Sequence, residues 1–551
     1  MPSALDDPFY YLNNFQAVLD WIGARYDDLL DDEERGFIAA FAGLPKASRA
    51  LLVRMVMRKG TLFRESKLAY AEIGPTRDAM LPLVAQGWVD AAPSLELAQL
   101  FALLRKPEIA ACFGTQLGRA TLRKADQLAL LQPLYPEAQP LEAWYPTLDE
   151  RIYALQLMAL CDRLRLMFFG NLAQDWSEFV LADLGIYQYE KVELDAASRG
   201  FRQRADIDFY LHLYQCRERF EAGEAPAEVL ADIPPAHDNP WLQSRRARLL
   251  FQLGQHCERL GEWALALEIY AGCSYPGARI RRIRVLEKTA EFDEAHRLAL
   301  DLAAGAHSEE ERQHLARILP RLQRKLGLPK AAARKPAPVL RLDLQLPRGE
   351  DFVSVEHCVA RHLADEPGPV HYVENTLINS LFGLLCWEAI FLPLPGAFFH
   401  PFHAAPADLL AADFHARRAE AFAACLAQLD GDAWQATIRR NHAAKYGLQS
   451  PFVYWGVLDE TLLEQALLCL PAAHLKLWFQ RLLLDIKTNR AGLPDLIRFW
   501  PGERRYQMIE VKGPGDRLQD NQLRWLDFCA EHQMPVTVCY VQWAETEAAL
   551  A

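Results

Sequence analysis

The sequence lacks the patterns on which several common protein classes depend. Its 11 cysteines are scattered between Cys112 and Cys539 without a CxxC pair, so zinc ribbons and iron–sulfur clusters have no ligand pattern. It has neither a P-loop nor a nucleophile elbow, so ATP-driven and serine-hydrolase activities lack support. His400 and His403 flank a Pro-Phe turn without completing a metal pattern. The odd, unclustered thiols are typical of a reducing cytosol.

Targeting and membrane signals are missing as well. The N-terminus has no basic segment followed by an apolar one, so no signal peptide is predicted. The most apolar stretch, residues 377–399, is interrupted by Asn379, Glu388 and two prolines, whereas a bilayer span needs about 20 cleaner residues. We therefore expect no membrane association, and at 377–399 a buried helix followed by a loop.

Length and residue pattern predict a multidomain, mostly α-helical protein. The 551 residues suggest about three or four domains, and 51% of them are hydrophobic, which is enough to bury substantial cores. The net charge of −12 taken alone argues mildly against nucleic acid binding. Because phosphate contacts are local, however, the distribution of charge matters more than the total.

Two basic clusters lie in the N-terminal part. Residues 1–75 show helical spacing over 14–30 and 37–57, and residues 46–67 hold seven cations against one acid, Glu65. Residues 76–140 predict a small helical module with a helix over 95–104, a new helix from Lys106-Pro107 and a loop at 114–118. The cations form either solvated helix faces or DNA contacts. The candidate DNA-binding residues are Arg54, Arg58, Lys59, Lys106, Arg119, Arg123 and Lys124.

Residues 141–328 carry helix patterns almost throughout. Trp263 and Phe292 lie 29 residues apart, each after a turn and before small residues. This spacing resembles helix-pair repeats of the tetratricopeptide (TPR) kind and predicts a helical array with a scaffold role. Four prolines between residues 329 and 347 predict a linker over 329–350, so residues 351–551 are expected to form a separate domain.

The C-terminal domain contains the pattern that carries chemistry. Strands are predicted at 495–500, 506–512 and 535–543, with a helix over 518–532 that Asp516 would cap. If residues 501–504 form the loop of a hairpin, Trp500 faces Arg505 and Asp495 falls opposite Glu510. Lys512 then shares a face with Glu510, while Val511 points to the other face.

Two carboxylates this close repel each other unless a cation lies between them, and Mg²⁺ and Mn²⁺ prefer oxygen ligands. Such an ion can activate water against a phosphate, and Lys512 could orient that water or neutralise developing charge. The alternative is an ordinary surface hairpin with acid–base cross-strand pairs. A loop one residue longer or shorter would exchange the faces.

At these residues the sequence resembles the PD-(D/E)xK nucleases and, more closely, their VRR-type nuclease domain. The matching strings are Gly492-Leu-Pro-Asp-Leu-Ile and Glu510-Val-Lys-Gly-Pro-Gly-Asp-Arg-Leu-Gln-Asp-Asn-Gln522. The wider chain resembles the Fanconi-associated nuclease family. Residues 52–59 resemble its N-terminal helix, 105–109 its SAP-type DNA-binding module, 145–328 its repeat region, 382–391 the helix that opens its catalytic domain, and 405–409 the following loop.

The resemblance implies a C-terminal α/β nuclease domain with a mixed sheet. It implies catalytic roles for Asp495, Glu510 and Lys512, and one or two Mg²⁺ or Mn²⁺ held by Asp495, Glu510, Glu374 and the Val511 backbone carbonyl. Glu374 could equally be a first-turn acid that favours the helix dipole, and Glu388 on the same helix is the rival ligand. Gln522 is expected near the site, and Asn521 takes a place where some relatives carry a basic residue.

The implied function is a structure-specific DNA nuclease of DNA repair, a 5′-flap endonuclease and 5′→3′ exonuclease that also acts at interstrand crosslinks. The alternatives are a Holliday-junction resolvase, usually a symmetric dimer, and a catalytically inactive repair scaffold. No ubiquitin-binding zinc finger is seen, which suggests a bacterial relative. We expect a monomer that binds branched DNA in the cytoplasm, on the nucleoid; a eukaryotic member would be nuclear.

Overall fold

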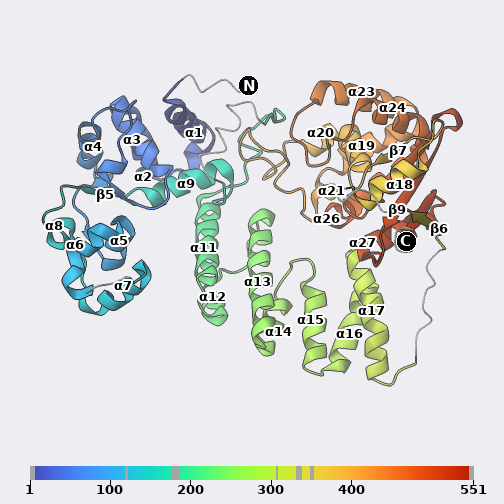
Figure 1. The fold of residues 1–551 in the computed structure, drawn as a ribbon, viewed down its shortest axis with the longest axis horizontal. Helices are drawn as coiled ribbons and strands as arrows, with labels where there is room; N and C mark the ends of the chain where they lie inside the picture. The colour runs from blue at the N-terminus through green and yellow to red at the C-terminus, as the bar shows by residue number, and fades with distance from the viewer. Residues whose placement is uncertain are drawn as a thin grey trace, which may run out of the picture. The chain divides into compact units, whose positions relative to one another are not determined.

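The computed structural model describes residues 7–117, 122–174, 187–305, 308–329, 338–347 and 353–544, and these are predominantly helical (Figure 1). The chain divides into two compact units. The first comprises Met1–Tyr187 and Phe201–Ile207, and the second comprises Gln188–Gly200 and Asp208–Ala551. The predicted mostly helical, multidomain organisation is confirmed.

The first unit begins with a group of helices, as the spacing of apolar residues predicts. They are α1 (Tyr10–Tyr26), α2 (Asp32–Gly43), α3 (Lys46–Val56) and α4 (Thr76–Ala85). A capping box between Asp31 and Glu34 starts α2. The single helical stretch expected over 37–57 is divided at Leu44-Pro45, because proline has no N–H to continue the helical hydrogen bonds.

A small antiparallel sheet in the first unit departs from the sequence prediction. Strand β5 (Ile152–Leu155) lies between β1 (Leu62–Arg64) and β2 (Val89–Asp90). All four residues of β5 are buried, so the strand is a short apolar run that periodicity cannot tell from a helix. The start of the region expected to be helical repeats therefore packs with the N-terminal part of the chain.

A second helical group in the same unit surrounds Phe101, Phe113 and Trp144. Its elements, with the helix that follows them, are β3 (Ser94–Leu95), α5 (Leu97–Leu103), α6 (Lys106–Leu117), α7 (Lys124–Leu131), β4 (Gln139–Pro140), α8 (Leu141–Trp144) and α9 (Met158–Phe169). Helix α6 begins at Lys106 as predicted. It continues through Gly114 to Leu117, so the loop expected from residue 114 is wrong.

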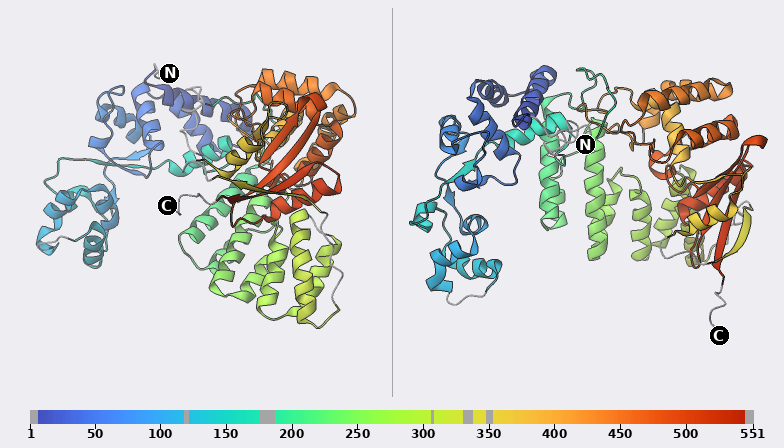
Figure 2. Two further views of the ribbon diagram at one scale, coloured as in Figure 1. Left: turned by 45° about the vertical axis from the view of Figure 1, so that its right-hand side comes forward. Right: turned by 45° about the horizontal axis from the view of Figure 1, so that its top comes forward.

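The second unit contains a helical array whose members α13 to α17 stand side by side (Figures 1 and 2). The helices are α11 (Arg204–Glu221), which starts in the first unit, α12 (Pro226–Asp232), α13 (Pro240–Leu260), α14 (Trp263–Ala271), α15 (Ala278–Lys288), α16 (Phe292–Ala304) and α17 (Glu309–Lys325). Trp263 and Phe292 begin α14 and α16, so they occupy equivalent positions, as their spacing predicts. A Cβ at Gly254 would lie 2.6 Å from the Tyr270 ring, so this small residue lets α13 and α14 pack closely.

A five-stranded mixed sheet forms the centre of the C-terminal domain, as predicted. Its strands are β6 (Leu340–Leu346), β7 (Val370–Tyr372), β8 (Leu496–Trp500), β9 (Arg505–Lys512) and β10 (Val536–Trp543), in the order β6-β10-β9-β8-β7. Strand β10 is parallel to both β6 and β9, whereas β8 is antiparallel to β9 and β7. Strand β6 lies inside the stretch expected to be a linker over 329–350, so that expectation is wrong for residues 340–346.

The helices of the C-terminal domain form a core on each face of this sheet, and several of them pack on other helices. They are α18 (Val355–Leu363), α19 (Leu377–Leu385), α20 (Trp387–Ile390), α21 (Phe414–Arg417), α22 (Ala419–Ala427), α23 (Ala433–Lys445), α24 (Glu460–Cys469), α25 (Ala472–Leu484), α26 (Ile486–Asn489) and α27 (Asp520–Glu531). Helix α19 is buried along its whole length, as expected for residues 377–399. In the described part of the chain no single helix has the length and apolarity for a membrane span, although the bent pair α24 and α25 passes by length and composition.

Candidate active site

The hairpin of β8 and β9 has the register that the sequence predicts. Trp500 pairs with Arg505 and Leu496 with Ile509, and a 3₁₀ turn over Pro501–Glu503 connects the strands. Arg504 completes the loop in the left-handed conformation, with a φ of 48°. When the register is continued by one residue, Asp495 falls opposite Glu510.

Asp495 and Glu510 end a row of directly opposed, buried side chains. Ile497 faces Met508 and Phe499 faces Tyr506, and all four belong to the core on one face of the sheet. The polar end of this row is also buried: Asp495 is 6% exposed, Glu510 0% and Lys512 7%. Val511 points to the opposite face, as predicted, and it belongs there to the same core as Val359 of α18.

The carboxylate of Glu510 has an unusual environment. Lys512 Nζ lies 2.8 Å from Glu510 Oε1 as an ion pair. The approach does not have hydrogen-bond geometry, and neither oxygen of Glu510 has a hydrogen-bond partner among the described residues. Asp495 Oδ2, by contrast, accepts a hydrogen bond of 2.8 Å from the Val511 N–H. A buried acid without a hydrogen-bond donor is rare in proteins and indicates a binding or catalytic role.

The two acids hold protons more tightly than ordinary carboxyl groups do. Burial raises the pKa of Asp495 to about 6, and the nearby charges of Glu374 and Glu356 contribute. Burial and the charge of Asp495 raise the pKa of Glu510 to about 7, against the opposing effect of Lys512. Perturbed carboxyls at one place mark this end of the hairpin as the candidate site.

The charge of Glu374 acts on the paired acids, but the residue does not lie on a helix. Glu374 lies in the turn between β7 and α19, so the expectation that it is a first-turn acid is wrong. Its oxygens accept hydrogen bonds from the Tyr372 hydroxyl at 2.6 Å and from Asn375 Nδ2 at 3.1 Å. Its charge contributes to the raised pKa of both Asp495 and Glu510.

The rival acid, Glu388, lies elsewhere. It belongs to α20, which is separated from α19 by a break at Cys386, so the two acids do not share a helix. Its side chain is exposed, and its charge acts on Cys386 and Cys425. Of the two candidates, only Glu374 is among the main groups that shift the pKa values of the paired acids.

Sequence reasoning did not identify Glu356, a further acid at the site. It lies in the first turn of α18, which the Ser354 side chain caps, and its charge raises the pKa of Asp495. The signal available in the sequence was a serine followed two residues later by an acid. That pattern marks a helix start, but it does not show that the helix packs on the sheet beside β9.

The segment after β9 differs from the prediction in its capping residue. Helix α27 is capped by Gln519, whose N–H donates to Gln522 Oε1 at 2.8 Å in a capping box. Asp516, the expected cap, instead accepts a hydrogen bond of 3.0 Å from the Gly513 N–H. The side chain of Gln522 is therefore engaged in starting the helix.

The candidate DNA-binding residues divide into engaged and exposed cations. Arg54 pairs with Glu72 at 2.6 Å and stacks on Tyr11, and Lys124 Nζ donates to the Leu104 carbonyl at 2.8 Å. These two side chains are held by the fold, so the structure does not favour their assignment to DNA. The exposed candidates are Arg58, Lys59, Lys106 and Arg123, of which Arg58 also donates to the Lys67 carbonyl at 2.7 Å. Arg119 lies outside the described residues.

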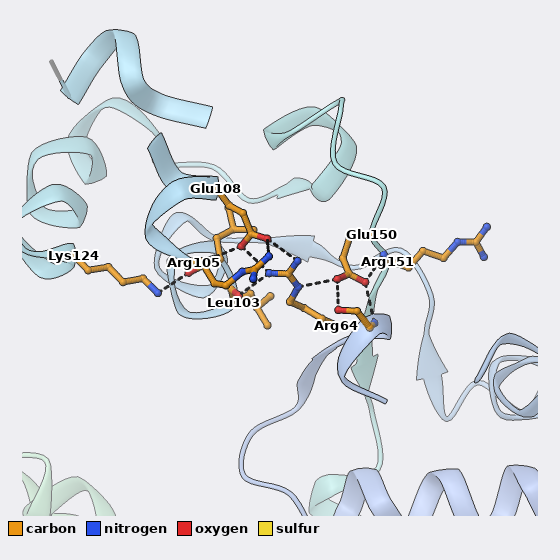
Figure 3. A network of polar contacts seen from close by, with 9 residues as sticks. Arg64, Leu103, Arg105, Glu108, Lys124, Glu150 and Arg151 are labelled. Carbon is orange, nitrogen blue, oxygen red and sulfur yellow. Dashed lines mark hydrogen bonds and ion pairs between the residues drawn. The ribbon is translucent and has the colours of Figure 1, made fainter. Parts of the chain in front are cut away.

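Another member of the first basic cluster, Arg64, is buried. Its guanidinium donates two hydrogen bonds of 2.8 Å to Glu108 and one of 2.9 Å to Glu150 (Figure 3). Arg64 belongs to β1, Glu108 to α6, and Glu150 precedes β5. The hydrogen bonds from Arg64 and Arg105 lower the pKa of Glu108 to about 2. Arg64 therefore joins the two helical groups of the first unit.

Comparison with known proteins places these modules in a family. Residues 9–90 match the family described as "FAN1, HTH domain", 94–144 the "Fanconi anemia-associated nuclease SAP domain" and 431–543 the "VRR-NUC domain". A Fanconi-associated nuclease 1 homolog of Pseudomonas aeruginosa is 64% identical over 542 residues, which cover 98% of this chain and 97% of that protein. The chain belongs to the Fanconi-associated nuclease family.

More distant Fanconi-associated nucleases are longer. The homolog of Oryza sativa subsp. japonica is 24% identical over 96% of this chain, and the Homo sapiens protein 25% identical over 97%. The matched region covers 62% of each of these two proteins. Two crystal structures of paFAN1, described as bound to 2nt and 1nt 5′ flap DNA with gap, are both 63% identical. They superpose with TM-scores of 0.93 and 0.90, covering 99% and 98% of this chain and 100% of theirs. The protein is accordingly a structure-specific DNA nuclease.

Proposed function

We propose that this Fanconi-associated nuclease is a metal-dependent 5′-flap endonuclease and 5′→3′ exonuclease that acts in DNA repair, including at interstrand crosslinks. The observation that carries the metal-dependent chemistry is Glu510, whose buried oxygens have no hydrogen-bond partner among the described residues, beside the equally buried Asp495. The choice of a 5′ flap rests on the likeness to paFAN1, which was crystallised with such DNA.

The donor set suits one or two Mg²⁺ or Mn²⁺ ions. The ligands would be the carboxylates of Asp495, Glu510 and Glu374 and the backbone carbonyl of Val511, all hard oxygen donors. As the side chains stand, no three acidic, histidine or cysteine side chains of the described residues are close enough to hold an ion. Binding would therefore require the carboxylates to move closer together. Once bound, the ion acts as a Lewis acid toward water and phosphate.

The protein's own groups have separable roles in this proposal. The Val511 N–H fixes one oxygen of Asp495, so this acid is oriented before substrate arrives. Lys512 balances the charge of Glu510, and it would orient a water or neutralise charge that develops on the phosphate. Because all three side chains are buried, bulk water is largely excluded from the reacting groups.

The exposed cations of the first unit are proposed as phosphate contacts. Arg58, Lys59, Lys106 and Arg123 would bind the DNA backbone without reading sequence, as would Arg119. Such contacts make affinity depend on junction shape and on salt rather than on base sequence. We expect the protein to act as a monomer on branched DNA in the bacterial cytoplasm.

The proposal is tested by digesting a 5′ flap, a 3′ flap and a four-way junction side by side, with Mg²⁺, with Mn²⁺ and with EDTA. We expect metal-dependent cleavage of the 5′ flap in preference to the other two. Asp495→Ala should abolish cleavage while flap binding, measured by fluorescence anisotropy, stays largely intact. Preference for the four-way junction would favour a resolvase. Full activity of the variant in Mg²⁺ would remove the proposed site.

A further inference from the structure

A cavity on the helical array carries an excess of positive charge. Its volume is about 530 Å³, and its walls include Trp263, Glu258 and four cations, Arg259, Arg281, Arg284 and Lys288, from α13, α14 and α15. This volume lies within the range of pockets that bind small molecules. None of these residues belongs to the nuclease site.

The cations of α15 differ in how their charges are balanced. On the side toward α16 and α17, Arg279 pairs with Glu311 at 2.6 Å and Arg282 with Glu294 at 3.8 Å. On the cavity side, Arg281 and Arg284 share one oxygen of Glu258, at 3.3 and 3.8 Å. Lys288 has no ion-pair partner among the described residues. One carboxylate therefore faces four cations.

Glu258 is not available to neutralise more of this charge. Its other oxygen accepts a hydrogen bond of 2.5 Å from the Tyr270 hydroxyl, so both of its oxygens are engaged. The exposed Arg284 and Lys288 stand four residues apart on α15, an arrangement of like charges that destabilises a helix. Packing does not explain an unbalanced set of cations around a hollow, but a ligand that brings negative charge does.

We propose that this cavity binds an acidic peptide segment of a partner protein. Carboxylates of the peptide would pair with Arg259, Arg284 and Lys288, and an apolar side chain would lie against the half-buried ring of Trp263. The ring of Trp263 at the cavity wall favours a peptide over the backbone of duplex DNA, because an apolar side chain can pack against it and a phosphodiester cannot. A hollow of about 530 Å³ also suits a short segment better than a continuous duplex. The proposal does not depend on the chemistry of the nuclease site.

The test uses the full-length protein and a fluorescein-labelled peptide of alternating Glu and Gly, with a Gln and Gly peptide as control. We expect anisotropy to show binding of the acidic peptide alone, weakening as salt is raised. The variant R284A/K288A should bind it roughly tenfold more weakly. The matched variant R297A/K325A removes two exposed cations from α16 and α17 and should bind like the unmodified protein. Flap DNA binding should be unchanged in both variants.

A charge-reversed variant distinguishes a lost binding site from a protein that fails to fold, because a gain of binding requires a folded protein. R284E/K288E should lose the acidic peptide and gain binding of a Lys and Gly peptide. The proposal is overturned if the acidic peptide does not bind at millimolar concentration, or if both alanine variants lose it equally. It is also overturned if R284A/K288A loses flap DNA as strongly as it loses peptide, because the surface would then be a DNA contact.

Discussion

The Val511 N–H donates a hydrogen bond of 2.8 Å to Asp495 Oδ2, so the backbone of β9 orients the acid that precedes β8. Val511 stands between Glu510 and Lys512, whose side chains share the opposite face of β9 from its own. One residue therefore fixes the position of Asp495 while its side chain secures the strand against α18. The position of Asp495 therefore depends on a hydrogen bond that an uncharged side chain could also accept. A substitution can remove the charge of this acid without changing its position.

Asp495→Asn should remove the charge and retain the geometry. The asparagine oxygen can still accept the Val511 N–H, so we expect normal folding. Cleavage of a 5′ flap in Mg²⁺ should fall by more than about a hundredfold, since even partners behind metal ligands are worth about 10–100-fold. Asp413→Asn, at an exposed acid on α21's cap, is the matched control and should cleave normally. Cleavage within a few-fold of the unmodified protein would contradict a ligand role for Asp495.

Metal affinity should rise with pH through the range 6 to 7. The pKa values of Asp495 and Glu510 are raised to about 6 and about 7, so both acids must release protons before they act as ligands. Calorimetric titration with Mn²⁺ at pH 5.5, 6.5 and 7.5 should show tighter binding at each step and proton release at the two lower values. An affinity independent of pH would show that these acids are not the ligands.

Without divalent ions, the same acids should make stability fall as pH rises. Their pKa values are higher in the folded than in the unfolded chain, so the folded state binds more protons between about pH 4 and 7. The contribution of the two protonated acids to the stability of the folded protein is complete below pH 4 and is lost above pH 7. Glu510→Gln removes one of the two acids whose ionisation lowers stability. In EDTA, the Tm of this variant should therefore exceed that of the unmodified protein at pH 8 but not at pH 4. A Tm difference that does not change with pH would contradict the raised pKa.

Gly492→Ala should disturb the segment that leads to Asp495. Gly492 has a φ of +92°, and a Cβ there would lie 2.8 Å from both the carbonyl carbon and the Cβ of Asn521. The strained backbone alone is worth about 1–3 kcal/mol. We expect lower stability in urea unfolding and reduced cleavage. Gly502→Ala in the hairpin loop, where the added Cβ meets nothing within 4 Å, should change neither.

Arg64→Met should destabilise the first unit locally. It leaves Glu108 and Glu150 without the guanidinium that both contact, and breaking a buried ion pair from one side costs about 3–5 kcal/mol. Hydrogen exchange should speed up in β1 and α6 while β9 keeps its protection. Arg77→Met, which removes an exposed partner of Glu65, is the control for loss of a surface cation. Equal exchange in the two variants would refute the role of Arg64.

The hairpin was predictable because its information is local. Pro501-Gly502 marks the turn, and alternating apolar residues on both sides fix which face is buried, so the register of Asp495 and Glu510 follows. The equivalent positions of Trp263 and Phe292 were predictable for the same reason, since each begins a helix after its own turn. These features need only neighbouring residues to be recognised.

The features that were missed depend on contacts between distant residues. Arg64 is 44 residues from Glu108 and 86 from Glu150, so the sequence shows a surplus of cations where the fold has a buried network. Glu356 reaches the site only because α18 packs on the sheet beside β7 and β9. The cap of α27 was missed for a different reason: Gln519 caps it although glutamine is not a preferred cap, and Asp516 is engaged in the preceding turn.

Strand β6 bears on how the nuclease domain could be produced alone. It covers the outer edge of β10 along seven residue pairs, and its charged Arg341 and Asp343 make it a poor template for another chain. A recombinant fragment that started at residue 353 would leave the backbone of β10 unpaired and prone to self-association. A truncation intended to stay monomeric should therefore begin upstream of Leu340.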